Sequence, residues 1–188
     1  MNKKLLVVGL IFTAVAIAAR LLPHMPNFVP VTALALFAGY YLPKKWSLIL
    51  PMLAMLISDL SLGFYESEVM VAVYGSFLVA VSIGWGIRKF GNEKINAAMI
   101  LAGSMAGSVF FFLVTNWAVW AFTQMYAKNL SGLLMSYQMG LPFLKWAFVG
   151  DLAWTAVFFG VYAIAVRFFP NVKLVDNFDS KFVVAQKI

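Results

Sequence analysis

Six residues able to hold a polar solute lie within or beside long apolar stretches of the sequence: Arg20, Asn27, Asp59, Asn116, Trp117 and Asp151. A guanidinium and two carboxylates can pair with charged groups of a ligand. Amides can orient it through hydrogen bonds, and an indole ring can stack on a planar part. Together these residue types predict a binding site for a polar or zwitterionic, partly planar organic molecule.

The two aspartates are the most informative of these residues, since Leu56-Ile57-Ser58 precedes Asp59 and Phe148-Val149-Gly150 precedes Asp151. Ionisable side chains in such apolar surroundings either pair with one another or mark a substrate pathway. We therefore expect Asp59 and Asp151 to contact a solute, to pair with Arg20 and Lys145, or to do both. The residues alone do not decide between these roles.

Several chemistries are disfavoured by what the sequence lacks. It has no cysteine and one histidine, His24, which we expect to be exposed in a proline-rich loop. No nucleophile paired with a base, no cluster of metal ligands and no glycine-rich phosphate motif is evident. We therefore predict no catalytic residue, no metal site and no cofactor.

The composition predicts an all-α membrane protein. Hydrophobic residues make up 63% of the 188, charged residues 11%, and the mean hydropathy is +0.90, whereas soluble domains carry about 25% charged residues. The net charge of +7 comes from short basic clusters between apolar segments. Such clusters set membrane topology, so nucleic acid is not an expected partner.

A single transmembrane domain over residues 1–188 is predicted, with spans at about 5–22, 31–42, 46–62, 69–87, 95–122 and 141–169 and a cytoplasmic tail over 170–188. Pro23, Pro26 and Pro30 require a loop between the first two spans. The second span is the weakest prediction, because about 12 residues are short for a bilayer crossing.

Orientation follows from the positive-inside rule. With the N-terminus inside, most basic residues lie on the cytoplasmic side: Lys3, Lys4, Lys44, Lys45, Arg88, Lys89, Lys94, Arg167, Lys173, Lys181 and Lys187. The bias holds at every inner loop only if the short segment 31–42 crosses. We therefore expect a bundle of six transmembrane helices in a bacterial inner membrane, both termini cytoplasmic, with all six candidate site residues in the outer half.

The architecture resembles the S components of energy-coupling factor transporters. The resemblance is carried by the six short spans, by Ala14-xxx-Ala18 in the first span and by the Asn27-Phe28-Val29-Pro30-Val31 entry to the second. Three stretches, the segment from Arg20 to Val31, Leu56-Ile57-Ser58-Asp59 and Gly140-Leu141-Pro142-Phe143, are similar to an uncharacterised family of bacterial membrane proteins described as S-component-like.

This resemblance implies a vitamin-type solute binder that carries no ATPase of its own. It also implies that Ala14 and Ala18 dock on a transmembrane scaffold that works with ATPase subunits, although small residues at this spacing also serve internal helix packing. Nothing in the motifs identifies the solute.

The alternative is a structural or accessory subunit of a larger multi-subunit membrane complex. Its support is the long last span and the aromatic-rich loops, which would bind neighbouring chains. Both hypotheses predict lipid contact, and neither includes an enzyme activity.

Overall fold

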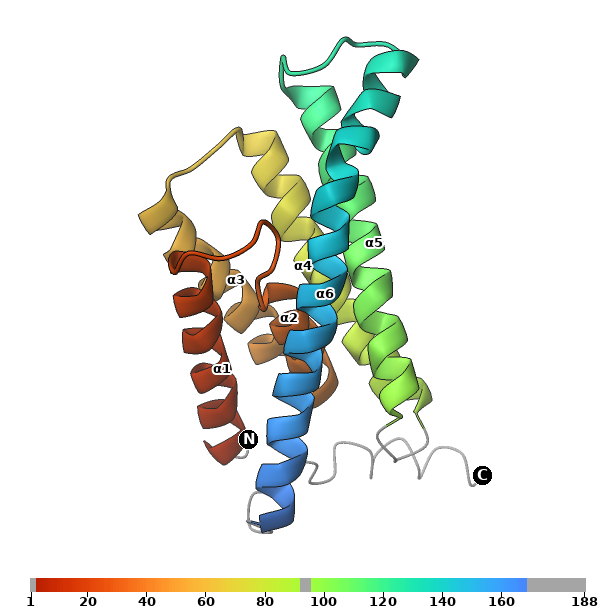
Figure 1. The fold of residues 1–188 in the computed structure, drawn as a ribbon. Coiled ribbons are helices and arrows are strands. Elements are labelled where there is room, and N and C mark those ends of the chain that lie inside the picture. The colour runs from red at the N-terminus through yellow and green to blue at the C-terminus, as the bar shows by residue number, and fades with distance from the viewer. Residues whose placement is uncertain (1–2, 92–95, 169–188) are drawn as a thin grey trace, which may run out of the picture.

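The computed structural model describes residues 3–91 and 96–168, and these form six α-helices with no strand (Figure 1). The helices are α1 (Lys3–Leu21), α2 (Val31–Tyr41), α3 (Lys44–Leu62), α4 (Ser67–Phe90), α5 (Ala97–Phe122) and α6 (Leu130–Phe168). The predicted all-α fold is confirmed. The tail expected over 170–188 lies outside the described residues.

Within the described ranges, every helix except α2 is long and apolar enough to cross a membrane. Helix α2 has 11 residues, or about 16 Å of helix, against a hydrocarbon layer of about 30 Å. The chain is thus built for a membrane with five helices of spanning length and one short helix. The six crossings and the orientation expected from the sequence stay predictions.

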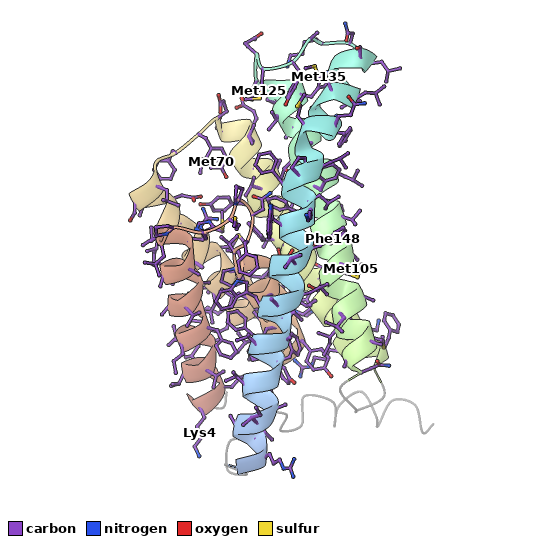
Figure 2. All side chains as sticks on the ribbon, viewed as in Figure 1. Lys4, Met70, Met105, Met125, Met135 and Phe148 are labelled. Carbon is purple, nitrogen blue, oxygen red and sulfur yellow. The ribbon has the colours of Figure 1, made fainter. Side chains whose placement is uncertain are left out.

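Successive helices run in alternating directions between the two ends of the bundle (Figure 1). Figure 2 places Lys4 at one end and Met125 and Met135 at the other. We call these the Lys4 end and the Met125 end. The first turns of α1 and α3 lie toward the Lys4 end, and α1, α3 and α5 finish toward the Met125 end.

Helix α2 is the core of the bundle. Every residue from Val31 to Gly39 is buried, and α2 contacts all five other helices. A helix that is apolar on all sides is suited to such a central position. Around its second half, the rings of Phe12, Phe37 and Phe158 pack together, with Phe12 and Phe158 stacked at 4.3 Å.

The chain enters α2 through an extended segment that descends into the bundle (Figure 1). Phe28 packs against Gly150 of α6, where an added Cβ would lie 2.9 Å from the Phe28 Cα. Pro30 is buried, and its carbonyl accepts the Leu34 N–H at 2.8 Å. Non-helical backbone is tolerated at membrane depth where protein surrounds it, so Phe28–Pro30 and α2 together form one continuous path through the bundle.

Helix α6 begins earlier than the sequence suggests, which corrects the prediction of a loop over residues 123–140. The helix starts at Leu130, and the Asn129 side chain caps it by accepting the Gly132 N–H at 2.9 Å. Gly132, Ser136 and Gly140 are buried at helical spacing, so packing holds this first part in place. Pro142 lies inside the helix, and membrane helices tolerate proline where neighbours satisfy the freed backbone.

Small residues divide between internal packing and the outer surface. Gly103 and Gly107 of α5 are buried, and an added Cβ on them would meet Ile87 of α4 and Thr32 of α2. Ala14 and Ala18 of α1 are exposed. The glycines therefore bring α5 close to its neighbours, while the two alanines of α1 remain on the outside of the bundle.

Candidate functional site

A partly buried ion pair joins the ends of α1 and α3. One guanidinium nitrogen of Arg20 bonds to Oδ1 of Asp59, and the other terminal nitrogen lies 3.0 Å from Sδ of Met55. The Tyr74 hydroxyl of α4 donates to Oδ2 of Asp59 at 2.8 Å. Both carboxylate oxygens therefore have donors, from two different helices.

Helix ends position these groups. Arg20 lies in the last turn of α1 and Asp59 in the last turn of α3. Gly63 ends α3 by adopting a φ of 97° and donating its N–H to the Asp59 carbonyl at 2.9 Å, a conformation that glycine reaches without a Cβ clash. Gly63, four residues beyond Asp59, thus terminates α3. Asp59 lies in the last helical turn, and its side chain is buried.

The pair lies at the boundary between the interior and the surface. The side chain of Asp59 is 2% exposed and that of Arg20 15%. The Nε–H of Arg20 is buried and has no hydrogen-bond partner among the described residues. A buried donor without an acceptor is costly, so Arg20 keeps one donor that its partners among the described residues do not use.

The charges of Arg20 and Asp59 also affect the pKa of Tyr65, which lies in the loop between α3 and α4. Burial and the nearby Asp59 carboxylate raise its pKa to about 12, and Arg20 partly offsets this rise. A carboxylate disfavours ionisation of a neighbouring phenol because both would be negative. Tyr65 therefore borders the ion pair from the loop side, and we call Arg20, Asp59, Tyr65 and Tyr74 the outer cluster.

Asp151 belongs to a second cluster, between α2, α5 and α6. The Ser108 hydroxyl lies 2.6 Å from its Oδ2, and the Thr32 hydroxyl bonds to the same carboxyl group. One turn away, Oγ of Ser104 lies 3.1 Å from Oγ1 of Thr155. We call these five residues the inner cluster.

Lys145 does not neutralise Asp151. Its ammonium group lies 5.5 Å from the centre of the Trp146 ring, and its side chain is exposed. Among the described residues, Asp151 meets hydroxyl groups and no Lys or Arg in ion-pair distance. The two aspartates, equivalent from sequence, thus have different surroundings: Asp59 has a cation and Asp151 does not.

Apolar side chains separate the two clusters. Val31, Met55 and Phe77 are buried and pack together, with Phe111 against them. Met55 contacts Arg20 on one side, while Val31 precedes Thr32 of the inner cluster. The outer cluster, from α1, α3, α4 and the loop before α4, and the inner cluster, from α2, α5 and α6, thus border the same apolar group and are not one continuous polar site.

The other sequence-predicted site residues lie elsewhere. Asn116 donates its side-chain amide to the Phe112 carbonyl of its own helix at 2.8 Å and packs against Gly140. Trp117 is 45% exposed, and the centre of its ring lies 5.6 Å from that of Phe122.

Asn27 is exposed in the proline-rich loop with a φ of 61°. His24 is exposed too, as expected. Of the six candidates, the structure therefore brings together Arg20 and Asp59, while Asp151, Asn27 and the Asn116–Trp117 unit each occupy a separate place.

Tyr74, Tyr65, Thr32 and Ser108 were missed by the sequence reasoning. The sequence did contain a signal for Ser108, because Gly103-Ser104 and Gly107-Ser108 repeat at a spacing of four. This spacing puts the two serine hydroxyls on one face of a helix, beside glycines that permit close helix packing. No comparable signal marks the tyrosines. In the described ranges, no group of three or more His, Cys, Asp or Glu side chains is placed to hold a metal ion.

Comparison with known proteins gives one family. Searches of the curated proteins and of the solved structures find no match. A family model described as "Family of unknown function (DUF6580)" matches residues 1–172. Since this match covers nearly all of the sequence, the chain belongs to the DUF6580 family.

Proposed function

We propose that this chain is the solute-binding membrane component of a small-molecule uptake transporter, with its site at the outer cluster. The observation that carries the proposal is the Arg20–Asp59 pair. It joins a buried carboxylate to a partly exposed guanidinium that still has a buried, unsatisfied N–H. Charged groups within a membrane bundle either form structural pairs or mark substrate pathways. The incomplete hydrogen bonding of Arg20 favours a substrate pathway here.

The membrane orientation belongs to the same proposal. The Lys4 end carries Lys44 and Lys45 at the start of α3 and Arg88 and Lys89 at the end of α4, and this bias supports the Lys4 end as the cytoplasmic face. Phe28–Pro30 with α2 then makes the sixth crossing, and both termini are cytoplasmic in a bacterial inner membrane. The outer cluster faces the outside.

The chemistry of the outer cluster favours a small zwitterion. A carboxylate can accept the Nε–H of Arg20, which is the geometry that guanidinium groups prefer, and an ammonium group can replace Arg20 as a partner of Asp59. Tyr65 and Tyr74 add an aromatic wall and two hydroxyls. A solute of this type exchanges the internal ion pair for two external ones, so no charge is left unpaired when it binds.

Docking on a transmembrane scaffold with ATPase subunits is the second part of the proposal. Val7, Ile11, Ala14, Ala18 and Leu21 of α1 are exposed and share one side of the helix by their spacing. Small residues permit close helix contact in lipid. Ala14 and Ala18 are therefore the proposed contact points.

A structural subunit of a larger complex remains the second candidate, and one observation favours it. Helices α5 and α6 extend beyond the end of α1 at the Met125 end (Figures 1 and 2). There the surface is rich in large apolar side chains: Trp117, Phe122, Met125, Leu130, Leu134, Met135 and Met139. Apolar patches of this kind mark interaction sites.

A thermal-unfolding screen of the purified protein tests the binding proposal. Small zwitterions, amino acids and their relatives included, are compared with matched anions and cations. We expect a zwitterion to raise the unfolding temperature of the native chain and not that of a Arg20→Met, Asp59→Asn double variant, since bound ligand stabilises the folded state by mass action. A solute that stabilises both forms equally would contradict this site.

A further inference from the structure

The inner cluster holds an ionisable group that the proposed function does not use. We propose that Asp151, with Ser108 and Thr32, is a reversible proton-binding site inside the helix bundle. The inference stands apart from the outer cluster, because it rests on different residues and needs no solute.

The first step is the isolation of Asp151. The residue is 4% exposed, and the groups facing it from each packed element are hydroxyls or apolar: Thr32 from α2, Ser108 from α5 and Phe28, from the entry loop, against the adjacent Gly150. A buried charge without a counter-charge is strongly unfavourable in hydrocarbon surroundings.

Charged groups elsewhere in the described part of the chain do not reach it. Lys145 of α6 is exposed beside the Trp146 ring. Arg20 and Asp59 are bonded to each other in the outer cluster, beside the apolar group of Val31, Met55 and Phe77. A proton is therefore the cation that these surroundings leave for the carboxyl group.

The second step is the hydrogen-bond arrangement of Ser108. Its Oγ lies 2.6 Å from Oδ2 of Asp151 and 3.1 Å from the Ser104 carbonyl oxygen. A serine hydroxyl has a single hydrogen, so it cannot fully serve two acceptors. When the carboxyl is protonated, Asp151 donates to Ser108 and Ser108 donates to the Ser104 carbonyl, so that both contacts become complete hydrogen bonds.

The third step is that the ionised form also has partners. Ser108 then turns its hydrogen toward Asp151, and the Thr32 hydroxyl bonds to the same group. Thr32 is the second residue of α2, and the N-terminal end of a helix favours a nearby negative charge. Loss of the proton thus requires rotation of one hydroxyl and no movement of a helix.

The two states differ by a single proton: the carboxylate and H⁺ combine to give the carboxylic acid, and no electron or other group is transferred. A site whose carboxyl group has a hydrogen-bond partner in both states takes up and releases its proton with little rearrangement. Such sites are the elements of proton-coupled steps in membrane proteins.

Infrared difference spectroscopy of the full chain in lipid vesicles tests this assignment. Spectra are recorded from about pH 5 to about pH 9, the range in which most exposed carboxylates are already ionised. We expect a protonated-carboxyl band that appears and disappears reversibly with pH and is absent from Asp151→Asn. Asp59→Asn should keep this band, which separates the result from the fate of the outer cluster.

A second pair of variants keeps the proposal testable if Asp151→Asn does not fold. Ser108→Ala should move the titration midpoint by a measurable amount, because it removes the rotating hydroxyl. Ser76→Ala removes a buried hydroxyl of α4 that donates to the Ala72 carbonyl of its own helix, outside the inner cluster, and should leave the midpoint unchanged. A band that never changes over this range, a midpoint indifferent to Ser108→Ala, or a midpoint that follows the sodium concentration would each overturn the proton site.

Discussion

Gly39 of α2 and Gly84 of α4 bring the backbones of the two helices into direct contact. A Cβ on Gly84 would lie 2.5 Å from the Leu36 carbonyl oxygen and 3.0 Å from the carbonyl carbon of Gly39, and a Cβ on Gly39 would overlap the Val81 carbonyl oxygen. Close approach of this kind is how membrane helices gain packing energy without a hydrophobic drive. The position of α2, and of Thr32 at its start, depends on this crossing.

Gly84→Ala is expected to destabilise the bundle. The added methyl meets three backbone atoms of α2, which cannot move like a side chain, so we expect a loss of about 3 kcal/mol, the upper part of the usual range for overpacking. Gly75→Ala on the same helix meets nothing within 4 Å and should be neutral or stabilising by up to about 1 kcal/mol. Reversible unfolding in mild detergent measures both, and equal effects would contradict the close contact.

Removal of one partner of the outer ion pair should cost more than removal of both. Asp59→Asn leaves the Arg20 guanidinium without a counter-charge and is expected to lose about 3 kcal/mol, near the lower limit for a broken buried pair because Arg20 is 15% exposed. The double variant with Arg20→Met should be more stable than the sum of the single changes. Tyr74→Phe removes one hydrogen bond and should cost about 1 kcal/mol. Additive losses in this cycle would show that the pair is not coupled.

Tyr65 should ionise at a higher pH than an ordinary tyrosine. Its pKa of about 12 lies above the ordinary value of about 10, so its contribution to stability is complete below about pH 10 and is lost as the pH rises through about 12. Absorbance titration of the native chain minus Tyr65→Phe isolates this group. In Asp59→Asn the midpoint should fall toward 10, because the negative neighbour is gone and the Arg20 charge is unbalanced. An unchanged midpoint would mean that burial alone raises the pKa.

Gly140→Ala tests the contact between the parts of α5 and α6 that lie toward the Met125 end. A Cβ there would lie 2.5 Å from Oδ1 of Asn116 and 2.8 Å from the Phe112 ring, whereas Gly160 of the same helix has open space around it. We expect Gly140→Ala to destabilise by about 1 to 3 kcal/mol and Gly160→Ala to have little effect. Limited proteolysis in the loop of residues 123–129 should accelerate in Gly140→Ala alone, and comparable rates in both variants would argue against this packing.

Much of the fold follows from hydropathy, which predicts helices wherever long apolar stretches occur and loops at clustered prolines. The sequence did not predict the start of α6, because Gly132, Gly140 and Pro142 are poor helix formers by local propensity. Packing of Gly132, Ser136 and Gly140 against α5 and the preceding loop overrides that propensity. Asn129 as an N-cap was the local signal available.

The candidate site was predictable only in part, for a geometric reason. Hydropathy sets the depth of a residue in the membrane but not the rotation of its helix. From depth alone, Asp59 and Asp151 are equivalent, and Trp117 is a candidate for stacking on a planar solute. Rotation gives Asp59 a cation, leaves Asp151 to hydroxyl groups, and turns Trp117 outward.

Native mass spectrometry of the gently solubilised protein from its own host tests solute binding at the outer cluster most directly. One spectrum reports retained small molecules and stoichiometric protein partners together. We expect a small zwitterionic ligand on the native chain that is lost from the Arg20→Met, Asp59→Asn double variant and kept by Asp151→Asn. A ligand-free chain held in fixed ratio among several different subunits would contradict it and would make this protein a structural component.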